Sequence, residues 1–392
     1  MSASTGGELV TKITQSINEV PAEQWDACEG DGNPFLSHAF LSALEDSECV
    51  NRRTGWGPVH LILEDEAGLL QSCVPLYMKS HSRGEYIFDH GWADAYERAG
   101  GRYYPKLLAA VPFVPATGRR LLVRRGPEAD AVEAQTINAL KAVSQQLEIA
   151  TVSVNFCLEE EWEHLADAGF LKRTDQQFHW YNRGYTDFEG FLDDLSSRKR
   201  KNIRRERAGA LENDIEIEIL QGSDLTEDHW DAFYGFYLDT GGRKWGTPYL
   251  NRTFFSLINE RMPEKIVLIM CKRQGRYIAG ALNFVGPDCI YGRHWGCVED
   301  HRFLHFEACY YQAIDYAIAH GLARVEAGAQ GPHKLARGYQ PTRIHSAHYI
   351  RDEGFRRAVA DYLEHERREV EHDMSYLEDR TPFRKGERLS LD

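Results

Sequence analysis

The chain has 392 residues, 42% hydrophobic and 27% charged, so it can bury substantial cores and is long enough for two domains of ordinary size. It carries 46 Lys and Arg against 60 Asp and Glu, and the resulting net charge of −14 argues against general binding to nucleic acid or anionic membranes. The sequence contains no apolar run long enough to span a membrane, no signal-peptide pattern and no CxxC pair among its eight cysteines. We therefore expect a cytoplasmic protein with reduced thiols, no membrane span and no DNA partner.

The first half of the chain predicts an alternating series of strands and helices. Apolar residues between Ile13 and Ile17 are typical of a half-buried strand, and Gly169 fits the end of a helix that needs a positive φ. The predicted elements are, in chain order, a strand at 13–17, helical stretches within 20–27 and 34–42, a strand–turn–strand unit at 59–79, an aromatic and histidine cluster at 86–92, a helix and a buried strand within 135–156, a short helix ending at 169–170 and a last strand at 178–182.

The second half repeats this order. Trp230-Asp231-Ala232 matches Trp25-Asp26-Ala27 in the first half. The other equivalent segments are a strand at 215–219, a helical stretch at 248–256, strands within 266–286, an aromatic and histidine cluster at 291–295, a helix and a strand within 309–329, a helix end at 338–339 and a last strand at 344–350. Five matches in the same order indicate a duplication, in which the first copy carries about thirty extra residues within 93–127.

The order of elements in each copy is β-α-α-β-β-β-α-β, followed by a short helix and a strand. This is the order of the GCN5-related N-acetyltransferase (GNAT) fold. We therefore predict a mixed α/β protein with two tandem GNAT-like domains, residues 1–183 and 184–392. The second domain would carry a charged helix at 355–377, packed on that domain or on a second subunit. A homodimer is thus one option for an oligomeric state that the sequence leaves open.

Several stretches are specific enough to carry a family resemblance. They are DHGWADAY (89–96), YYPKLLAAVPFVPATGRRLL (103–122), QFHWYNRGY (177–185), SRKRKNIRRER (197–207), RKWGTPYL (243–250), AGALNF (279–284), YGRHWG (291–296), FLHFEACYYQAIDYAI (303–318) and VEAGAQGPHKLARGYQP (325–341). Through them the chain resembles the FemAB-like group of predicted N-acyltransferases, whose members pair two GNAT-type domains. Fem enzymes proper transfer aminoacyl groups from tRNA to peptidoglycan precursors, and other proteins of this fold use acetyl-CoA. The resemblance implies an N-acyltransferase with acyl-CoA or aminoacyl-tRNA as co-substrate, a small-molecule or peptide amine as acceptor, and no tightly bound cofactor.

Two departures from the family pattern leave the donor open. The usual loop for the CoA diphosphate is absent from both copies, and its nearest substitute is Arg124-Arg125-Gly126-Pro127 before a helix, which is also a common surface turn. A coiled-coil arm, which some Fem enzymes carry and which is associated with tRNA contact, is also missing. The sequence therefore favours neither acyl-CoA nor aminoacyl-tRNA.

A basic segment at 198–207 is the main candidate for holding the donor. It contains seven basic residues and one acidic residue, Glu206. In a helix, Arg198, Lys201 and Arg205 would share one face. Such a face can bind the phosphates of CoA or of a tRNA end. The alternative is a solvated helix face without a ligand. The predicted donor-binding residues are Arg198, Lys199, Lys201, Arg204 and Arg205.

The segment 325–341 is the main candidate for catalysis. Glu326 would point away from Val325 and Ala327 on a buried strand, an unusual place for a carboxylate, where it can act as a general base towards an amine. The other predicted catalytic residues are His294 and Lys334, and Gln330 and His333 would help to hold the substrate or its carbonyl. The Lys334 assignment also follows the resemblance, since Fem enzymes carry a functional lysine near this place. The alternative is that Glu326 pairs with an arginine such as Arg293 and is structural.

Further substrate-binding residues are predicted beside these. Strand alternation places His294 and Arg293 on opposite faces unless Gly292 introduces a bulge. The alternative to a binding role for this segment is a buried aromatic layer with a hydrogen-bonded histidine. The predicted substrate-binding residues are Arg293, Trp295, the first-copy cluster Asp89, His90 and Trp92, and the loop residues Lys244 and Trp245. Both clusters would line one groove between the domains.

The sequence shows no pattern typical of a metal site, a nucleotide-binding loop or a catalytic nucleophile. No zinc spacing, P-loop, GxSxG elbow or activated cysteine is present, so we expect no metal and no covalent enzyme intermediate. The prediction is transfer of an acyl or aminoacyl group to an amine by direct attack. The alternative is a non-catalytic protein of the same fold that binds peptidoglycan fragments or amino-acid-like ligands.

Overall fold

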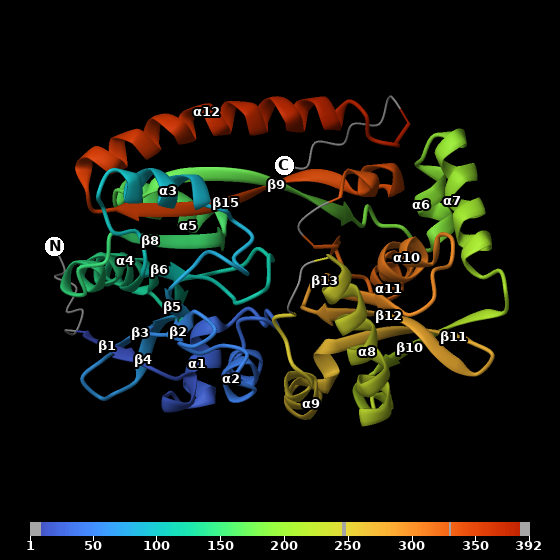
Figure 1. Ribbon diagram of the computed structural model, residues 1–392, viewed down its shortest axis with the longest axis horizontal. Helices are drawn as coiled ribbons and strands as arrows, with labels where there is room; N and C mark the ends of the chain where they lie inside the picture. Colours follow the sequence, from blue (N-terminus) through green and yellow to red (C-terminus); the bar gives the residue numbers. More distant parts are fainter. Residues whose placement is uncertain (1–8, 245–247, 329–330, 385–392) are drawn as a thin grey trace. The chain divides into compact units, whose positions relative to one another are not determined.

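The computed structural model describes residues 9–244, 248–328 and 331–384, and it divides into two compact units (Figure 1). Unit 1 contains the described residues up to Asp175 together with Arg343–Val370. Unit 2 contains Gln176–Thr342 together with the described residues that follow Val370. Across these ranges no helix has the length and the apolar character needed to cross a bilayer.

Unit 1 combines two groups of strands with five α-helices that precede Asp175 and with part of the C-terminal helix. A four-stranded antiparallel sheet has the order β1 (Val10–Thr14), β3 (His60–Glu64), β4 (Leu70–Val74), β7 (Leu122–Val123). A second group follows the order β8 (Thr151–Cys157), β6 (Lys106–Ala109), β5 (Leu76–Lys79), β2 (Trp56–Pro58). The helices are α1 (Ala22–Glu29), α2 (His38–Asp46), α3 (His90–Arg98), α4 (Ala129–Gln146) and α5 (Glu159–Asp167). Apolar residues of α4 and of the buried strand β8 share one hydrophobic core, as their sequence patterns predict.

Unit 2 is built around six neighbouring strands. Their order is β10 (Ile215–Gln221), β11 (Ile266–Arg273), β12 (Arg276–Val285), β13 (Cys289–Cys297), β14 (Arg324–Glu326), β9 (Leu171–Tyr181). The helical elements are α6 (Phe188–Asp193), α7 (Ser197–Ala210), α8 (Glu227–Lys244), α9 (Arg252–Arg261), α10 (Leu304–Phe306), a π-helical turn η4 (Glu307–Tyr311), α11 (Gln312–Ala319) and a 3-10 helix η5 (Pro332–Arg337). In Figure 1, α10 and α11 lie beside β12 and β13. Alternate residues of β13, β14 and β9 (Ile290, Val325 and Trp180) enter one core with α11, so the opposite alternation faces the other side of the sheet.

The last strands of the two sequence repeats are exchanged between the units. Strand β9 comes from the first repeat, yet its end pairs antiparallel with β14 of unit 2. Strand β15 (Gln340–Ile350) comes from the second repeat, and it pairs antiparallel with β8 of unit 1. The contact-based units therefore depart from a division of the chain at 183/184, which stays a prediction for the boundary of the two repeats.

The C-terminal helix α12 (Glu353–Glu378) matches the predicted charged helix in its bounds. Up to Val370 it belongs to unit 1, where Val359 and Leu363 share a core with Trp92. Arg173 also donates to Glu366 at 2.7 and 2.8 Å. Packing of this part of the helix on the second domain was therefore a wrong prediction, because the exchanged strand β15 delivers α12 to unit 1.

The alignment of the two repeats needs one correction. Strand β6 pairs parallel with β8 as β13 pairs parallel with β14, so β6 is the counterpart of β13. The cluster at 86–92, which we expected to match 291–295, instead forms a loop and the start of α3. The extra residues of the first copy thus lie between Lys79 and Lys106, at the ends of β5 and β6, rather than within 93–127.

Two glycines associated with α8 give a prediction about packing. A Cβ atom on Gly296 of β13 would lie 2.2 Å from the backbone oxygen of Phe236, so helix α8 rests directly on this glycine. We expect Gly296→Ala to destabilise the protein by roughly 2 kcal/mol or more, because rigid backbone would have to move. Gly235→Ala, on the same helix with nothing within 4 Å, should be neutral or stabilising by up to about 1 kcal/mol. Urea unfolding of both variants measures the difference, and equal effects would contradict it.

Candidate functional site

Strands β13 and β14 run side by side over three residues and then part. Their parallel register joins Cys289 to Arg324, Ile290 to Val325 and Tyr291 to Glu326, where β14 ends. Strand β13 continues to Cys297, paired with β12 on its other side. Beyond Glu326 the backbone edge of β13 therefore has no β14 partner. The ladder between these two strands therefore ends at Tyr291 and Glu326.

A β-bulge lies at the place where these strands part. In the register with β12, Leu282 faces His294 and Asn283 faces Gly292, so Arg293 is the extra residue of β13. The chain beyond β14 passes beside Gly292, where a Cβ would be in ordinary van der Waals contact, 3.6 Å from both Ala327 Cα and Glu326 O. The bulge that the sequence offered as one option at Gly292 is present, and it re-aims Arg293 and His294.

Glu326 ends β14 as a buried carboxylate with a side chain 4% exposed. Its Oε1 accepts a hydrogen bond from Arg324 Nε at 3.2 Å, and Arg324 also pairs with Asp288. Its Oε2 has no hydrogen-bond partner among the described residues. The alternative prediction, that Glu326 pairs with an arginine, is thus met in part, with Arg324 as the partner instead of Arg293. The other carboxylate oxygen is buried and can still accept a proton or a hydrogen bond.

Two residues that the sequence did not single out face this carboxylate from β9. His179 lies directly opposite Glu326 in the antiparallel register, with its Nε2 4.0 Å from Glu326 Oε2. Tyr181 lies opposite Arg324 and shares a hydrogen bond of 3.1 Å with Thr342. The alternation of FHWYN predicts the strand and its two faces, but nothing in the sequence indicates that this strand pairs with β14.

Lys334 is a second buried polar group near the end of β14. Its side chain is buried, and its Nζ donates to the backbone oxygen of Gly328 at 2.9 Å. Burial lowers the pKa of Lys334 to about 8, so the amine remains mostly protonated at neutral pH but can release its proton. The neighbouring His333 is exposed and shares a hydrogen bond of 2.8 Å with the Tyr310 hydroxyl.

The remaining predicted residues of β13 lie in an aromatic setting. His294 packs edge-on to Tyr237 with ring centroids 5.1 Å apart, and burial lowers its pKa to about 3, so it stays neutral. The rings of Trp295 and His305 pack edge-on, with their centroids 5.4 Å apart. Both side chains and Arg293 are half-buried. A neutral His294 can accept or donate one hydrogen bond but carries no charge for an oxyanion.

Three predicted residues fall partly or wholly outside the described structure. Gln330 and Trp245 lie outside the described residues. Lys244 ends helix α8. These three stay predictions from the sequence.

Helix α7 divides its basic residues between two faces. Arg200, Arg204 and Arg207 are held in ion pairs with acidic residues of unit 2, which are Asp193 for Arg200, Glu189 for Arg204, and Glu307 and Asp315 for Arg207. Arg198, Lys201 and Arg205 are exposed and have no ion-pair partner among the described residues. Lys199 is half-buried on the same helix. Of the five predicted donor-binding residues, Arg204 is thus engaged within the protein, and the predicted face of Arg198, Lys201 and Arg205 is open to solvent.

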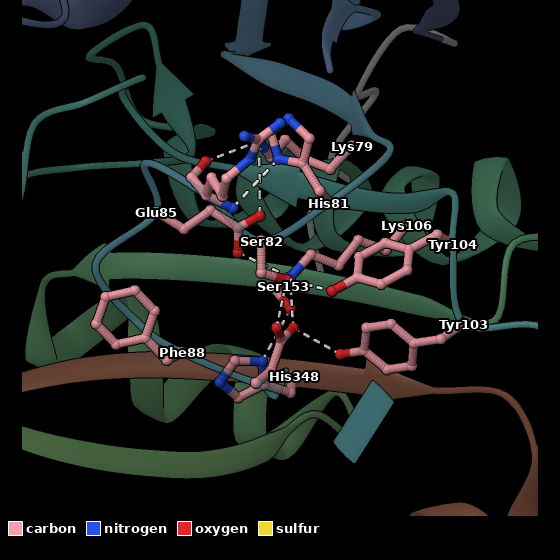
Figure 2. Close-up of polar contacts among 12 residues, drawn as sticks. Lys79, His81, Ser82, Glu85, Phe88, Tyr103, Tyr104, Lys106, Ser153 and His348 are labelled. Carbon is pink, nitrogen blue, oxygen red and sulfur yellow. Dashed lines mark hydrogen bonds and ion pairs between the residues drawn. The ribbon is translucent and has the colours of Figure 1, made fainter. Parts of the chain in front are cut away.

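In unit 1, Asp89 belongs to a buried ionic cluster, defined by Lys79, Ser82, Glu85, Asp89, Tyr103 and Lys106. Figure 2 labels the members other than Asp89. Lys106 Nζ contacts Asp89 and lies 2.7 Å from Glu85 Oε2, and Tyr103 donates to Asp89 at 2.6 Å. Burial alone would raise the pKa of Asp89, but the Lys106 charge and the hydrogen bonds bring it to about 2. Ser82 donates to the other Asp89 oxygen, so both oxygens are engaged within the protein, and the cluster anchors the inserted segment to β5 and β6.

The two other predicted residues of the first-copy cluster have different surroundings. His90 is exposed and stacks on Phe88, with ring centroids 5.8 Å apart. Trp92 is buried, edge-on to His348 at 4.9 Å, with the Arg173 guanidinium 4.9 Å from its ring. Trp92 is therefore a core residue of unit 1.

Across the described ranges, no group of three or more His, Cys, Asp or Glu side chains is placed to hold a metal ion.

The fold is shared with solved structures of low sequence identity. Crystalline FemX is 13% identical with a TM-score of 0.54, over 90% of this chain and 100% of that chain. The C-terminal domain of a putative lysylphosphatidylglycerol synthetase from Agrobacterium fabrum is 9% identical with a TM-score of 0.53, over 89% and 96%. L-PGS from Bacillus licheniformis is 10% identical with a TM-score of 0.50, over 91% and 98%. The predicted fold class is thereby confirmed.

The family follows from the sequence itself. The model of the FemAB-like family, described as peptidoglycan biosynthesis/recognition, matches residues 16–385, so the chain belongs to this family. A comparison with curated proteins found no match. The resemblance predicted from the sequence is thus confirmed.

Proposed function

We propose that the protein is an N-acyltransferase that joins an acyl or aminoacyl group to an amine by direct attack, with its reaction centre in unit 2. The observation that carries this proposal is Glu326, whose unpartnered Oε2 is buried where β13 and β14 part. An amine must lose a proton as it forms an amide, and a fixed carboxylate at the end of β14 can supply the base. The FemAB-like family and the names of two structural neighbours, FemX and lysylphosphatidylglycerol synthetase, support an aminoacyl donor.

The proposed reaction forms a C–N bond and breaks the bond between the carbonyl carbon and the leaving oxygen or sulfur. The amine nitrogen attacks the carbonyl carbon while Glu326, directly or through one water, takes the proton. Lys334, with a pKa of about 8, stabilises the negative charge that grows on the carbonyl oxygen or returns a proton to the leaving group. Arg293, His294, Trp295 and His333 are proposed to hold the substrate around this centre.

The acceptor proposed from the family description is the amine of a peptidoglycan precursor, and the proposed location is the cytoplasm, where such precursors are made. The donor is proposed to be aminoacyl-tRNA or acyl-CoA. Thermal shift against alanyl-tRNA, acetyl-CoA and free CoA tests donor binding, because a ligand that binds the native state raises the melting temperature with its concentration. We expect such a rise with one donor. No shift with any of them, together with a shift from muropeptides, would instead favour a non-catalytic binding protein.

The outward face of α7 is proposed to contact the donor phosphates. We expect Lys201→Ser/Arg205→Ser to weaken donor binding by about tenfold at low salt, with a smaller loss at high salt, because each phosphate contact releases counterions. The matched control is Arg276→Ser/Arg357→Ser, which removes two exposed cations from β12 and α12. Filter binding of labelled donor at two salt concentrations measures the difference. Equal affinities of the two double variants would assign the α7 face to solvation alone.

A further inference from the structure

His179 is a buried histidine placed at the candidate site by an exchanged strand. It lies on β9, which the first repeat contributes to unit 2, and its side chain is 5% exposed. Its ring Nε2 donates to Gln177 Oε1 at 3.1 Å, two residues earlier on the same face of the strand. This bond fixes the tautomer with hydrogen on Nε2.

The same N–H is the polar group that faces the unpartnered oxygen of Glu326. The distance of 4.0 Å between Nε2 and Oε2 is too long for a hydrogen bond, while Arg324 already binds the other oxygen, Oε1. His179 and Arg324 thus bracket the carboxylate from two sides. A hydrogen bond to Oε2 would require the imidazole to move towards the carboxylate, while Arg324 binds the other oxygen.

Burial is the main reason that the His179 imidazole favours its neutral form. Burial lowers its pKa, and the charged groups that face it are Glu326 and Arg324 on β14 and Lys334 in η5. A neutral imidazole cannot cancel the negative charge of Glu326 as a second cation would. It can orient Oε2 and still leave this oxygen basic enough to take a proton.

We propose that His179 is a positioning residue for the reaction centre of unit 2, which holds Glu326 Oε2 in the orientation that accepts the proton from the attacking amine. The site in unit 2 is then composite: the first repeat supplies its orienting histidine and the second repeat supplies its base. This inference rests on the proposed function of Glu326. It assigns to the strand exchange a role beyond folding.

Substitutions at His179 test the role, with a matched histidine as control. His179→Phe keeps the ring volume and removes both nitrogens, whereas His179→Gln places an amide N–H near the position of Nε2. The control is His348→Phe, because His348 is also buried on an exchanged strand, opposite Ser153 on β8, and shares a hydrogen bond of 2.9 Å with that serine. No carboxylate contacts His348 through a hydrogen bond among the described residues, so this variant removes a buried, hydrogen-bonded imidazole that orients no carboxylate.

The kinetic readout is transfer of labelled alanine from alanyl-tRNA, or of acetyl from acetyl-CoA, to a lysine-containing peptidoglycan precursor peptide. For His179→Phe we expect kcat to fall about tenfold with KM within about twofold, and the acid limb of the pH profile to move. His179→Gln should recover most of kcat, and His348→Phe should change neither parameter. Unchanged kcat in His179→Phe, or the same loss in His348→Phe, would overturn the proposal.

A second measurement needs no substrate, so it tests the role of His179 separately from the proposed role of Glu326 as the base. It also remains possible if the His179→Phe variant does not fold. In long-range proton–nitrogen spectra of histidine-labelled protein at pH 7.5, His179 should appear as the neutral Nε2–H tautomer, identified by its loss in His179→Gln. Its shifts should change in Glu326→Gln. A charged His179, the other tautomer, or no response to Glu326→Gln would overturn the positioning role. If Glu326→Gln keeps full transfer activity, the proposed function fails instead.

Discussion

Glu326→Gln should lower the rate of acyl or aminoacyl transfer at least about tenfold while the protein stays folded. The amide has nearly the shape of the carboxylate and can still accept the hydrogen bond from Arg324 Nε on its oxygen. It cannot take a proton from the attacking amine. The expected loss is therefore in kcat, with KM close to that of the wild type, and steady-state kinetics with either donor measures it.

A second buried carboxylate of unit 2 provides the control. Glu307 is 1% exposed and pairs with Arg207 at 2.9 Å, so Glu307→Gln also removes a buried charge. It should lower the melting temperature and leave kcat within about twofold of the wild-type value. An unchanged rate in Glu326→Gln, or equal rate losses in the two variants, would refute the role of Glu326 as the base.

Lys106→Met should cause the largest loss of stability that we predict. Lys106 is fully buried and contacts Asp89, Glu85 Oε2 at 2.7 Å and Ser82 Oγ at 2.8 Å. Its removal leaves the buried Asp89 without its ion-pair partner and leaves Glu85 with Lys79 alone, whose Nζ lies 3.7 Å from Glu85 Oε1. We expect a loss of about 3–5 kcal/mol in the free energy of unfolding, measured by urea denaturation.

An exposed ion pair of the same unit serves as the comparison. Lys172 pairs with Glu163 at the surface, with side chains 29% and 52% exposed, and Lys172→Met should cost at most about 1 kcal/mol. A double variant provides a second check. Lys106→Met/Asp89→Asn also removes the unpaired charge of Asp89, so it should regain part of the lost free energy of unfolding. A Lys106→Met protein as stable as Lys172→Met would show that the ionic cluster does not anchor the inserted segment.

The repetitive order of elements made the fold predictable from the sequence. Hydrophobic alternation at Ile215, Ile217 and Ile219 and the strand–turn–strand units locate strands directly, because side-chain period follows backbone geometry. The exchange of β9 and β15 was beyond such reasoning. Both strands have a similar alternation and both follow a similar short helix, so their sequences do not indicate which neighbouring strand they pair with.

The candidate site was predictable where one strand is sufficient to define it. Glu326 stands out because a carboxylate interrupts an apolar strand, and Lys334 follows from the resemblance. His179 was missed because its significance depends on pairing with a distant strand. Asp89 was expected to bind substrate, but its position beside Lys106 arises from the inserted segment folding back onto β5 and β6. Long-range pairings of this kind are set by tertiary packing, which local patterns do not determine.

The central claim, that unit 2 forms an amide from an activated acyl donor and an amine, can be tested by identifying the product. Wild-type protein and Glu326→Gln would be incubated with alanyl-tRNA or acetyl-CoA and a lysine-containing peptidoglycan precursor peptide, and the peptide would be analysed by mass spectrometry. We predict a mass increase of one alanyl or acetyl group on a peptide amine with wild-type protein, and at least about tenfold less with Glu326→Gln. Binding of donor and peptide without any new amide would contradict the claim.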